Sequence, residues 1–220
     1  MKGLIFGPPG AGKGTQGLLL EERLHIPVIS TGQIFRDAIS SGSSEALQLK
    51  EIIASGQLVP DEVVINIAID RISQSDCKSG FILDGFPRTI QQAKVASESG
   101  VRFDFILELV LDSDEIVRRI SGRRFHPASG RTYHISDRPP KNPGLDDLTH
   151  EPLICRDDDS MDSVLKRIKI YEDITKPILD FYTSQKNDFT LEHIKVGGLG
   201  GVDAVHASIL EKMRQCQIIS

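Results

Sequence analysis

The chain has 220 residues, 26 of them basic and 31 acidic, and this length can bury a good core in one domain or in one domain with insertions. The formal net charge of -5 argues against a non-specific nucleic-acid partner. The sequence contains no stretch of 18 apolar residues and no leader of charged residues followed by apolar ones, so we expect neither a membrane partner nor secretion. Three widely spaced cysteines, Cys77, Cys155 and Cys216, are typical of reduced thiols, so we expect a cytoplasmic protein.

The first predicted strand and helix enclose a glycine-rich loop. An apolar run at residues 4–6 predicts a strand, residues 16–24 favour a helix, and residues 7–15 between them read Gly-Pro-Pro-Gly-Ala-Gly-Lys-Gly-Thr. Such a turn points backbone N–H groups inward, and the N-terminus of the following helix adds a partial positive charge. The loop is therefore suited to holding the phosphates of a nucleotide.

The spacing Gly7-x4-Gly12-Lys13 is that of a P-loop, with one departure. In the strict motif Ser or Thr follows the lysine, whereas here Gly14 follows it and Thr15 comes one place later. Lys13 is expected to reach the outer phosphates, and Thr15 to place a hydroxyl near a metal ion. The loop alone does not distinguish a kinase from a switch GTPase or a motor.

Further apolar runs predict strands at residues 27–29, 81–83, 105–111 and 193–196, with helical patterns between them. This alternation predicts an α/β fold with a parallel sheet covered on both faces. Ligands of such sheets bind beyond the carboxyl ends of the strands, which is where residues 7–15 fall.

Two segments break the alternation. Residues 31–59 contain two short helical patterns separated by the polar run at residues 40–44, with no strand between them. Residues 122–159 contain five of the eleven prolines and lack sustained helical periodicity. We expect both segments to be insertions into the core.

Six arginines fall at the predicted junctions between core and insertions. They are Arg36, Arg88, Arg119, Arg123, Arg156 and Arg167. Phosphoryl transfer spreads negative charge over several oxygens, which guanidinium groups bind in bidentate fashion. This set therefore favours an enzyme that acts on phosphates over a protein that only binds a nucleotide.

These blocks together resemble the adenylate kinases, in the form with a long lid, over residues 1–196. The resemblance is carried by residues 7–16, Ser30-Thr31-Gly32, Leu58-Val59-x-Asp61-Glu62, GFILDGFPRT at residues 80–89, Gly122-Arg123-Arg124 and Gly130-Arg131-x-Tyr133-His134. LDGFPRT, combined with the loop, is highly specific for nucleoside-monophosphate kinases.

The resemblance implies a three-layer α/β/α P-loop fold around a central, parallel, five-stranded sheet. It assigns residues 1–29, 60–121 and 160–220 to the core, residues 30–59 to a helical insertion that binds the monophosphate, and residues 122–159 to the lid. The implied reaction is reversible phosphoryl transfer from MgATP to AMP, which gives two ADP and serves adenine-nucleotide homeostasis. The resemblance also implies a monomer.

The resemblance implies the site residues position by position. Residues expected at ATP are Gly10, Ala11, Gly12, Lys13, Gly14, Thr15, Arg119, Arg123, Thr132, Tyr133 and Gly200. Residues expected at AMP are Thr31, Arg36, Gln57, Leu58, Val59, Gly85, Phe86, Pro87, Arg88, Gln92, Arg156 and Arg167. The catalytic set is Lys13, Asp84, Arg88, Arg123, Arg156 and Arg167, with no general base required because positioning and electrostatics can supply most of the rate.

Magnesium is expected to be bound indirectly. Because Gly14 displaces the usual hydroxyl, we expect Mg²⁺ to be held through water, with Asp84 in its outer shell and no direct protein ligand. The family usually has aspartate after Ser-Thr-Gly, whereas this chain has Gln33, so a carboxylate near the metal is missing.

Some relatives hold the lid with a zinc ion on four ligands. The corresponding residues here are His126, Ser129, Asp146 and Thr149. Serine and threonine hydroxyls are poor zinc ligands, so we expect a hydrogen-bonded polar cluster and no structural zinc.

Two alternatives remain open from the sequence. The first is a kinase of another monophosphate, UMP, CMP or GMP. Gln92 and the long lid favour AMP over these, and the side-chain amide of Gln92 can pair with both a donor and an acceptor on the adenine edge. The second is a P-loop nucleotide sensor without catalysis.

Overall fold

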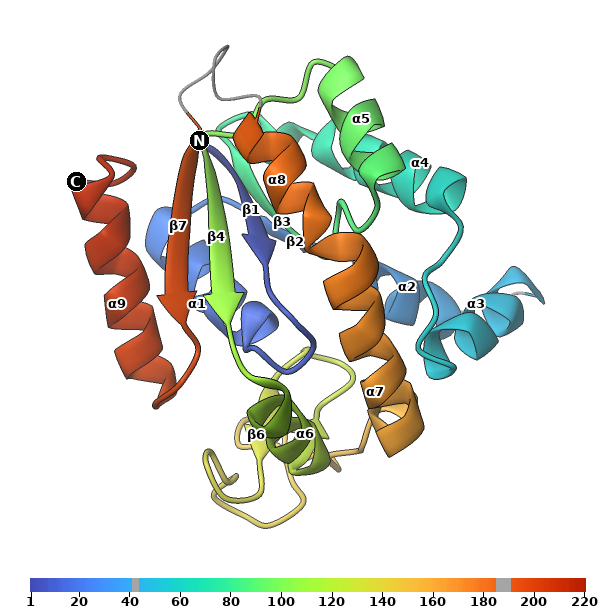
Figure 1. Cartoon of the computed structure of the whole chain (residues 1–220). Helices are drawn as coiled ribbons and strands as arrows, with labels where there is room; N and C mark the ends of the chain where they lie inside the picture. The colour runs from blue at the N-terminus through green and yellow to red at the C-terminus, as the bar shows by residue number, and fades with distance from the viewer. Residues whose placement is uncertain (41–43, 185–190) are drawn as a thin grey trace.

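A five-stranded parallel sheet organises the computed structural model, which describes residues 1–40, 44–184 and 191–220 (Figure 1). Its strands are β1 (Lys2–Phe6), β2 (Val28–Ser30), β3 (Phe81–Asp84), β4 (Phe105–Val110) and β7 (Glu192–Gly197), in the order β2-β3-β1-β4-β7. The predicted strands and their parallel arrangement are confirmed. Because every strand runs the same way, the loops after all five strands meet at one edge of the sheet.

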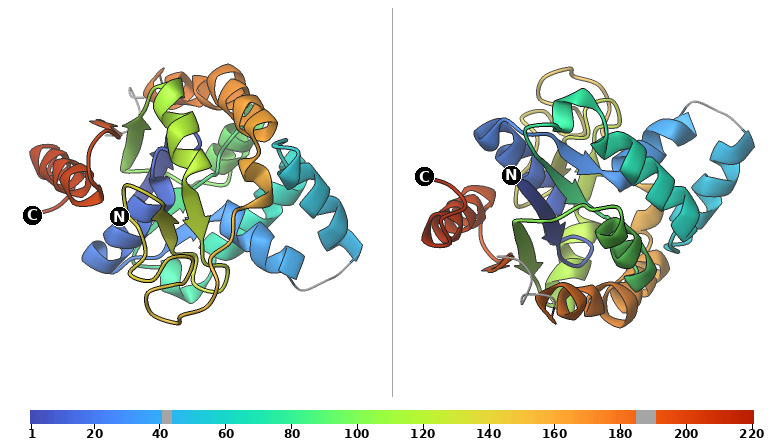
Figure 2. Two further views of the ribbon diagram at one scale, coloured as in Figure 1. Left: turned by 90° about the horizontal axis from the view of Figure 1, so that it is seen from below. Right: turned by 90° about the horizontal axis from the view of Figure 1, so that it is seen from above.

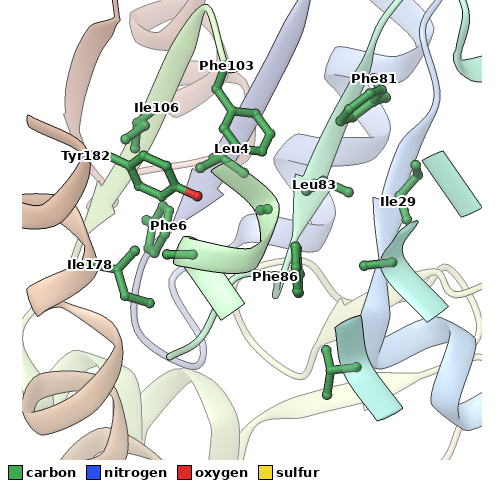
Figure 3. Packing of buried hydrophobic residues seen from close by; sticks show 14 of the residues in the cluster. Leu4, Phe6, Ile29, Phe81, Leu83, Phe86, Phe103, Ile106, Ile178 and Tyr182 are labelled. Atoms are coloured by element: carbon green, nitrogen blue, oxygen red, sulfur yellow. The ribbon is translucent and has the colours of Figure 1, made fainter. Parts of the chain in front are cut away.

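Alternating apolar side chains along each strand build a core on both faces of the sheet. In β1, Leu4 and Phe6 belong to one hydrophobic cluster and Ile5 to another. The first cluster, shown in Figure 3, packs the sheet against α4 (Asp61–Ile72), α5 (Ile90–Glu98) and α8 (Pro177–Ser184). The second packs it against α1 (Lys13–Leu24) and α9 (Val202–Gln215). These two layers fix the positions of the strand ends.

Two helices connect the core to the segment at residues 122–159. Helix α6 (Ser113–Ser121) follows β4, and α7 (Met161–Ile170) runs through the π-helical turn Tyr171–Thr175 toward α8. Both begin with a side-chain cap, since Asp112 accepts a hydrogen bond from the Glu115 amide and Ser160 from the Ser163 amide. In the described part of the chain, no helix is long and apolar enough to cross a membrane.

The two segments that break the alternation lie outside the sheet. Residues 31–59 contain α2 (Thr31–Ser40) and α3 (Ser44–Ala54), and the middle of the predicted break, residues 41–43, lies outside the described residues. Residues 122–159 contain the antiparallel pair β5 (Arg123–Phe125) and β6 (Thr132–His134) and the short 3-10 helix η2 (Asp157–Asp159).

These two segments contact each other across the carboxyl edge of the sheet. Lys50 of α3 lies 3.8 Å from Asp157 of η2. The guanidinium of Arg36 in α2 lies 5.5 Å from the centre of the Phe125 ring in β5. Seen from below, the yellow loops around β5 and β6 lie next to α2 (Figure 2). The space over the strand ends is therefore bounded from two sides.

Candidate active site

A cavity of about 750 Å³ occupies the carboxyl edge of the sheet, between the glycine-rich loop, α2, α7 and residues 122–159. Almost every residue that the sequence predicts at the site lines it. These residues are Gly10, Ala11, Gly12, Lys13, Gly14, Thr15, Thr31, Arg36, Gln57, Leu58, Val59, Asp84, Gly85, Pro87, Arg88, Gln92, Arg119, Arg123, Thr132, Tyr133, Arg156, Arg167 and Gly200. Segments far apart in the sequence thus converge on one cavity.

Phe86 is the exception, because its side chain does not line the cavity, and its place at the site stays a prediction. Gly85 has a φ of 84°, which turns the chain sharply at the end of β3. The Phe86 ring then points into the core, where it is 2% exposed and belongs to the cluster of Figure 3. Burying this apolar ring anchors the turn, while Pro87 and Arg88 beside it line the cavity.

The glycine-rich loop is left-handed at Gly10 and Gly12, with φ values of 76° and 93°. Gly12 precedes α1 without a side-chain cap, so the first amides of the helix remain open to an anion. Lys13 curls back over the loop, and its Nζ donates to the carbonyl oxygens of Gly7 at 2.6 Å and Pro8 at 2.8 Å. Burial lowers the pKa of Lys13 to about 8, and the Asp84 carboxylate limits this fall.

Asp84 ends β3 and lines the cavity, in register with Ile5 of β1 and Ser30 of β2. The residue is 8% exposed, and its carboxylate accepts no hydrogen bond from any residue that the structure describes. A buried carboxylate that accepts no hydrogen bond from the protein suits the shell of a hydrated Mg²⁺, which prefers oxygen ligands and retains its waters. The oxygen donor set therefore fits the predicted outer-shell role.

The loop after β3 is held by side chains on both sides. Arg88 donates from Nε to the Gly85 carbonyl oxygen at 2.8 Å, and the Thr31 hydroxyl donates to the same oxygen at 3.0 Å. Burial lowers the pKa of the Arg88 guanidinium, while Asp84 and Asp158 oppose that shift. Arg88 is thus a half-buried cation that lines the cavity and can bind an anion.

Gln92 is 1% exposed and uses both ends of its amide within the protein. Its Oε1 accepts from the Arg88 backbone amide at 2.7 Å, and its Nε2 donates to Asp61 at 2.8 Å. Asp61 also accepts from the Thr89 hydroxyl at 2.9 Å. Asp61 is a positioning residue that sequence reasoning missed, although it lies inside the Leu58–Glu62 block that carried the resemblance.

Two of the predicted arginines are paired with consecutive aspartates. Arg123 binds Asp159 in bidentate fashion, with Nε to Oδ2 at 2.9 Å and Nη2 to Oδ1. Arg167 pairs through Nη1 with the Asp158 carboxylate at 2.7 Å. Burial acts to raise the pKa of Asp158, but Arg167 and its neighbours outweigh it and hold that pKa below its usual value. These pairs set the orientation of both guanidinium groups.

Arg119 and Arg156 have different surroundings. Arg119 donates to Glu115 at 2.7 Å and to the Gly198 carbonyl oxygen at 2.6 Å, which joins α6 to the glycine-rich segment after β7. The Nε of Arg156 is buried and has no hydrogen-bond partner among the described residues. Burial, together with the charges of Arg123 and Arg36, lowers the pKa of Arg156 to about 9.

The four residues at the zinc-ligand positions form the predicted hydrogen-bonded cluster. His126 Nδ1 lies 2.7 Å from the Ser129 hydroxyl, and the Thr149 hydroxyl lies 3.3 Å from His126 Nε2 and 3.1 Å from Asp146. Asp146 is fully buried and also accepts two hydrogen bonds from Arg131. Within residues 1–40, 44–184 and 191–220, no three His, Cys, Asp or Glu side chains group closely enough to hold a metal ion directly.

Comparison with known families adds one finding to this geometry. The family model described as adenylate kinase matches residues 5–187 of the chain. The match begins in β1 and includes the glycine-rich loop, the LDGFPRT block and the whole of residues 122–159.

Proposed function

Because the chain belongs to the adenylate kinase family and is a phosphotransferase of the nucleoside-monophosphate kinase type, we propose that it transfers the terminal phosphate of MgATP to AMP. The products of this reversible reaction are two ADP, and the role is maintenance of the adenine-nucleotide balance. One observation carries the proposal: a single cavity joins a P-loop lysine to five cationic side chains from α2, the β3 loop, β5, residue 156 and α7.

Two groups of residues that line the cavity support the placement of the two substrates. The loop around Lys13 offers the open amides of α1, which suit the phosphates of ATP. Arg36 and Arg88 line the cavity from α2 and from the loop after β3, where they would bind the phosphate of AMP. Arg123 and Arg167, already oriented by Asp159 and Asp158, would then stabilise the charge on the transferring phosphoryl group.

Magnesium would neutralise charge on the ATP phosphates. The carboxylate of Asp84 would hold its water shell, with no direct protein ligand, in keeping with the absence of a hydroxyl at Gly14. The side chains of this chain would do the remaining work, which is to bind both phosphates, align them and exclude water.

Residues 30–59 are proposed to be the insertion that binds the monophosphate, and residues 122–159 the lid. Their mutual contacts, through Lys50 and Asp157 and through Arg36 and Phe125, support an enclosed state in which bulk water cannot compete for the phosphoryl group.

AMP is favoured over other monophosphates by the residues around Gln92. Its amide is held by Arg88 and Asp61 in one orientation, which leaves one N–H and one oxygen lone pair to recognise a base edge. A fixed amide discriminates between bases better than an apolar pocket does, because the wrong base leaves a buried polar group unpaired.

The test is ADP formation from ATP with each of AMP, UMP, CMP and GMP, with and without Mg²⁺. We expect rapid ADP production only with AMP and Mg²⁺. Faster turnover with another monophosphate would transfer the proposal to that substrate. Nucleotide binding without any ADP formation would contradict catalysis and favour a sensor.

A further inference from the structure

Phe125 is a buried aromatic residue outside all three hydrophobic clusters. The residue is 3% exposed and lies at the end of β5. The guanidinium carbon of Arg156 lies 4.0 Å from the ring centre, and that of Arg36 lies 5.5 Å away. Both distances are within the range in which a cation is attracted to the face of an aromatic ring.

The backbone fixes the ring in this place. The Phe125 amide donates to the Ile154 carbonyl oxygen at 2.8 Å, and the Ile154 amide donates back to the Phe125 carbonyl oxygen at 2.9 Å. Phe125 is also in register with Thr132 of β6. The position of the Phe125 ring is therefore fixed by Ile154 on one side and Thr132 on the other. Arg156 follows Ile154 by two residues, which places its side chain on that ring.

Arg156 has few other partners. Its Nε is buried without a hydrogen bond, and its guanidinium has no carboxylate within 4 Å among the residues described. Arg123 and Arg167, by contrast, each have an aspartate. Among the described residues, the ring of Phe125 is thus the nearest attractive group to the Arg156 guanidinium, and the carboxylates of Asp158 and Asp159 attract it from beyond 4 Å.

We propose that Phe125 is a positioning residue that holds the guanidinium of Arg156, and more weakly that of Arg36, at the phosphate site through the face of its ring. The inference rests on the proposed function, since it assigns these two arginines to substrate phosphates. An aspartate in this place would neutralise Arg156 and compete with the incoming phosphate. An aromatic ring offsets the repulsion between the two cations while leaving their charge available to the substrate.

The contact also joins the two insertions, because Arg36 comes from α2 whereas Phe125 and Arg156 come from residues 122–159. A phosphate bound by Arg36 would therefore bind next to a second guanidinium already in position. Loss of the ring should weaken the use of AMP more than it weakens the use of ATP, whose P-loop site does not depend on this contact.

The first experiment compares Phe125→Leu with Phe103→Leu. Phe103 is a buried core ring that packs edge-on against Tyr182 at 5.8 Å, so its replacement removes the same atoms far from the arginines. We expect Phe125→Leu to lower kcat/KM for AMP about 5- to 20-fold and to change KM for ATP less than twofold. Phe103→Leu should lower the midpoint of thermal unfolding and leave both KM values within twofold.

The second experiment separates the electrostatics of the ring from its shape. Site-specific incorporation of mono-, di- and trifluorophenylalanine at position 125 weakens the negative face of the ring while nearly preserving its size. We expect kcat/KM for AMP and the affinity for AMP measured by calorimetry to fall stepwise with fluorination, at constant thermal stability. The same series in an Arg156→Met background should be much shallower, because only the weaker contact with Arg36 remains.

The outcomes are distinct. A wild-type protein that forms no ADP from ATP and AMP would overturn the proposed function. An active wild type with no fluorination trend, or a trend of undiminished size in Arg156→Met, would overturn the role of Phe125 alone. A stepwise decline that is strongly reduced in Arg156→Met supports it.

Discussion

The side-chain oxygen of Gln33 accepts two hydrogen bonds from the guanidinium of Arg36, from Nε at 3.2 Å and from Nη2 at 2.9 Å. The Gln33 amide nitrogen donates at the same time to Asp37 at 2.7 Å. The residue that departs from the family motif is therefore the one that orients an arginine proposed to bind AMP. It does so without a negative charge, so the cation of Arg36 stays available to a phosphate.

Gln33→Glu should weaken AMP binding. The new carboxylate has the same length but would form an ion pair with Arg36 and repel Asp37, so we expect KM for AMP to rise about tenfold at nearly unchanged KM for ATP. Gln33→Leu is the matched control, because it removes the acceptor without adding charge, and its KM for AMP should rise only about threefold. Equal effects of the two replacements would show that charge at position 33 is not what matters.

The affinity for ATP should fall as the pH rises above about 8. Burial lowers the pKa of Lys13 from 10.5 to about 8, and a bound polyphosphate stabilises the protonated amine. Affinity is then constant below pH 8 and falls by up to tenfold per pH unit above it, with a proton taken up on binding. The phosphates of ATP are fully ionised in this pH range, so they contribute no protons. Calorimetry in buffers of different ionisation enthalpy therefore measures the proton uptake of the Lys13 amine on binding.

Lys13→Arg is the control for this pH dependence, since a guanidinium stays charged throughout the range. Its affinity should not depend on pH between 8 and 10. The contribution of Lys13 to folding stability changes with pH in the opposite direction. Because its pKa is lower in the folded protein, the unfolded chain binds more protons between pH 8 and 10.5. This group therefore makes the free energy of unfolding rise with pH in that range. An affinity of the wild type that is flat to pH 10 would contradict the assignment.

The sheet and the loop could be predicted because their signals are local. Strands buried on both faces read as short apolar runs, and glycines with left-handed φ such as Gly10 and Gly12 mark a turn that few other residues adopt. The resemblance then placed nearly all site residues at the cavity, since each lies in a block with a fixed relation to a strand end.

Residues whose partners lie in another segment could not be predicted in this way. Phe125 follows Gly-Arg-Arg in a stretch without periodicity, and its neighbours Arg36 and Arg156 are distant in the sequence. Phe86 was placed at the site because its neighbours are there, yet the turn at Gly85 sends its ring into the core. Side-chain direction at such turns depends on tertiary packing, for which one sequence carries no pattern.

Asp146→Asn should loosen residues 122–159, the proposed lid. Asp146 accepts hydrogen bonds from Arg131 at 2.8 and 2.6 Å, from the Tyr133 hydroxyl at 2.9 Å and from the Thr149 amide at 2.9 Å. The amide of asparagine presents one acceptor oxygen and places an N–H group where the second carboxylate oxygen was, so the bidentate contact with Arg131 is lost and the remaining donors compete for one oxygen. We expect faster hydrogen exchange of the amides at residues 148 and 149, a lower kcat, and unchanged exchange in β1 and β3.

Arg131→Lys provides the control for the lid, because it keeps the charge beside Asp146 and removes the bidentate geometry. Its amide exchange should lie between that of the wild type and that of Asp146→Asn. If Asp146→Asn left exchange at residues 148 and 149 unchanged, the hydrogen-bonded cluster would not be what holds these residues in place.

Gly122→Ala should destabilise the junction between α6 and β5 by overpacking. Gly122 has a φ of -86°, which any residue can adopt, so backbone strain is not the reason for glycine here. An added Cβ would lie 2.2 Å from His134 Nε2, closer than atoms approach in folded proteins. The imidazole cannot move freely, because its Nδ1 accepts hydrogen bonds from the amides of Ser136 at 3.2 Å and Asp137 at 3.1 Å.

We therefore expect Gly122→Ala to lower the free energy of unfolding by about 1 to 3 kcal/mol, as measured by denaturant titration. In the double variant Gly122→Ala, His134→Ala the clash is absent, so the losses of unfolding free energy caused by the two single replacements should not add. The double variant should be more stable, by at least about 1 kcal/mol, than the sum of the single losses predicts. Strictly additive losses would mean that His134 does not fill the space over Gly122. The kcat of Gly122→Ala, compared with that of the double variant, then tests whether the same contact limits movement of residues 122–159.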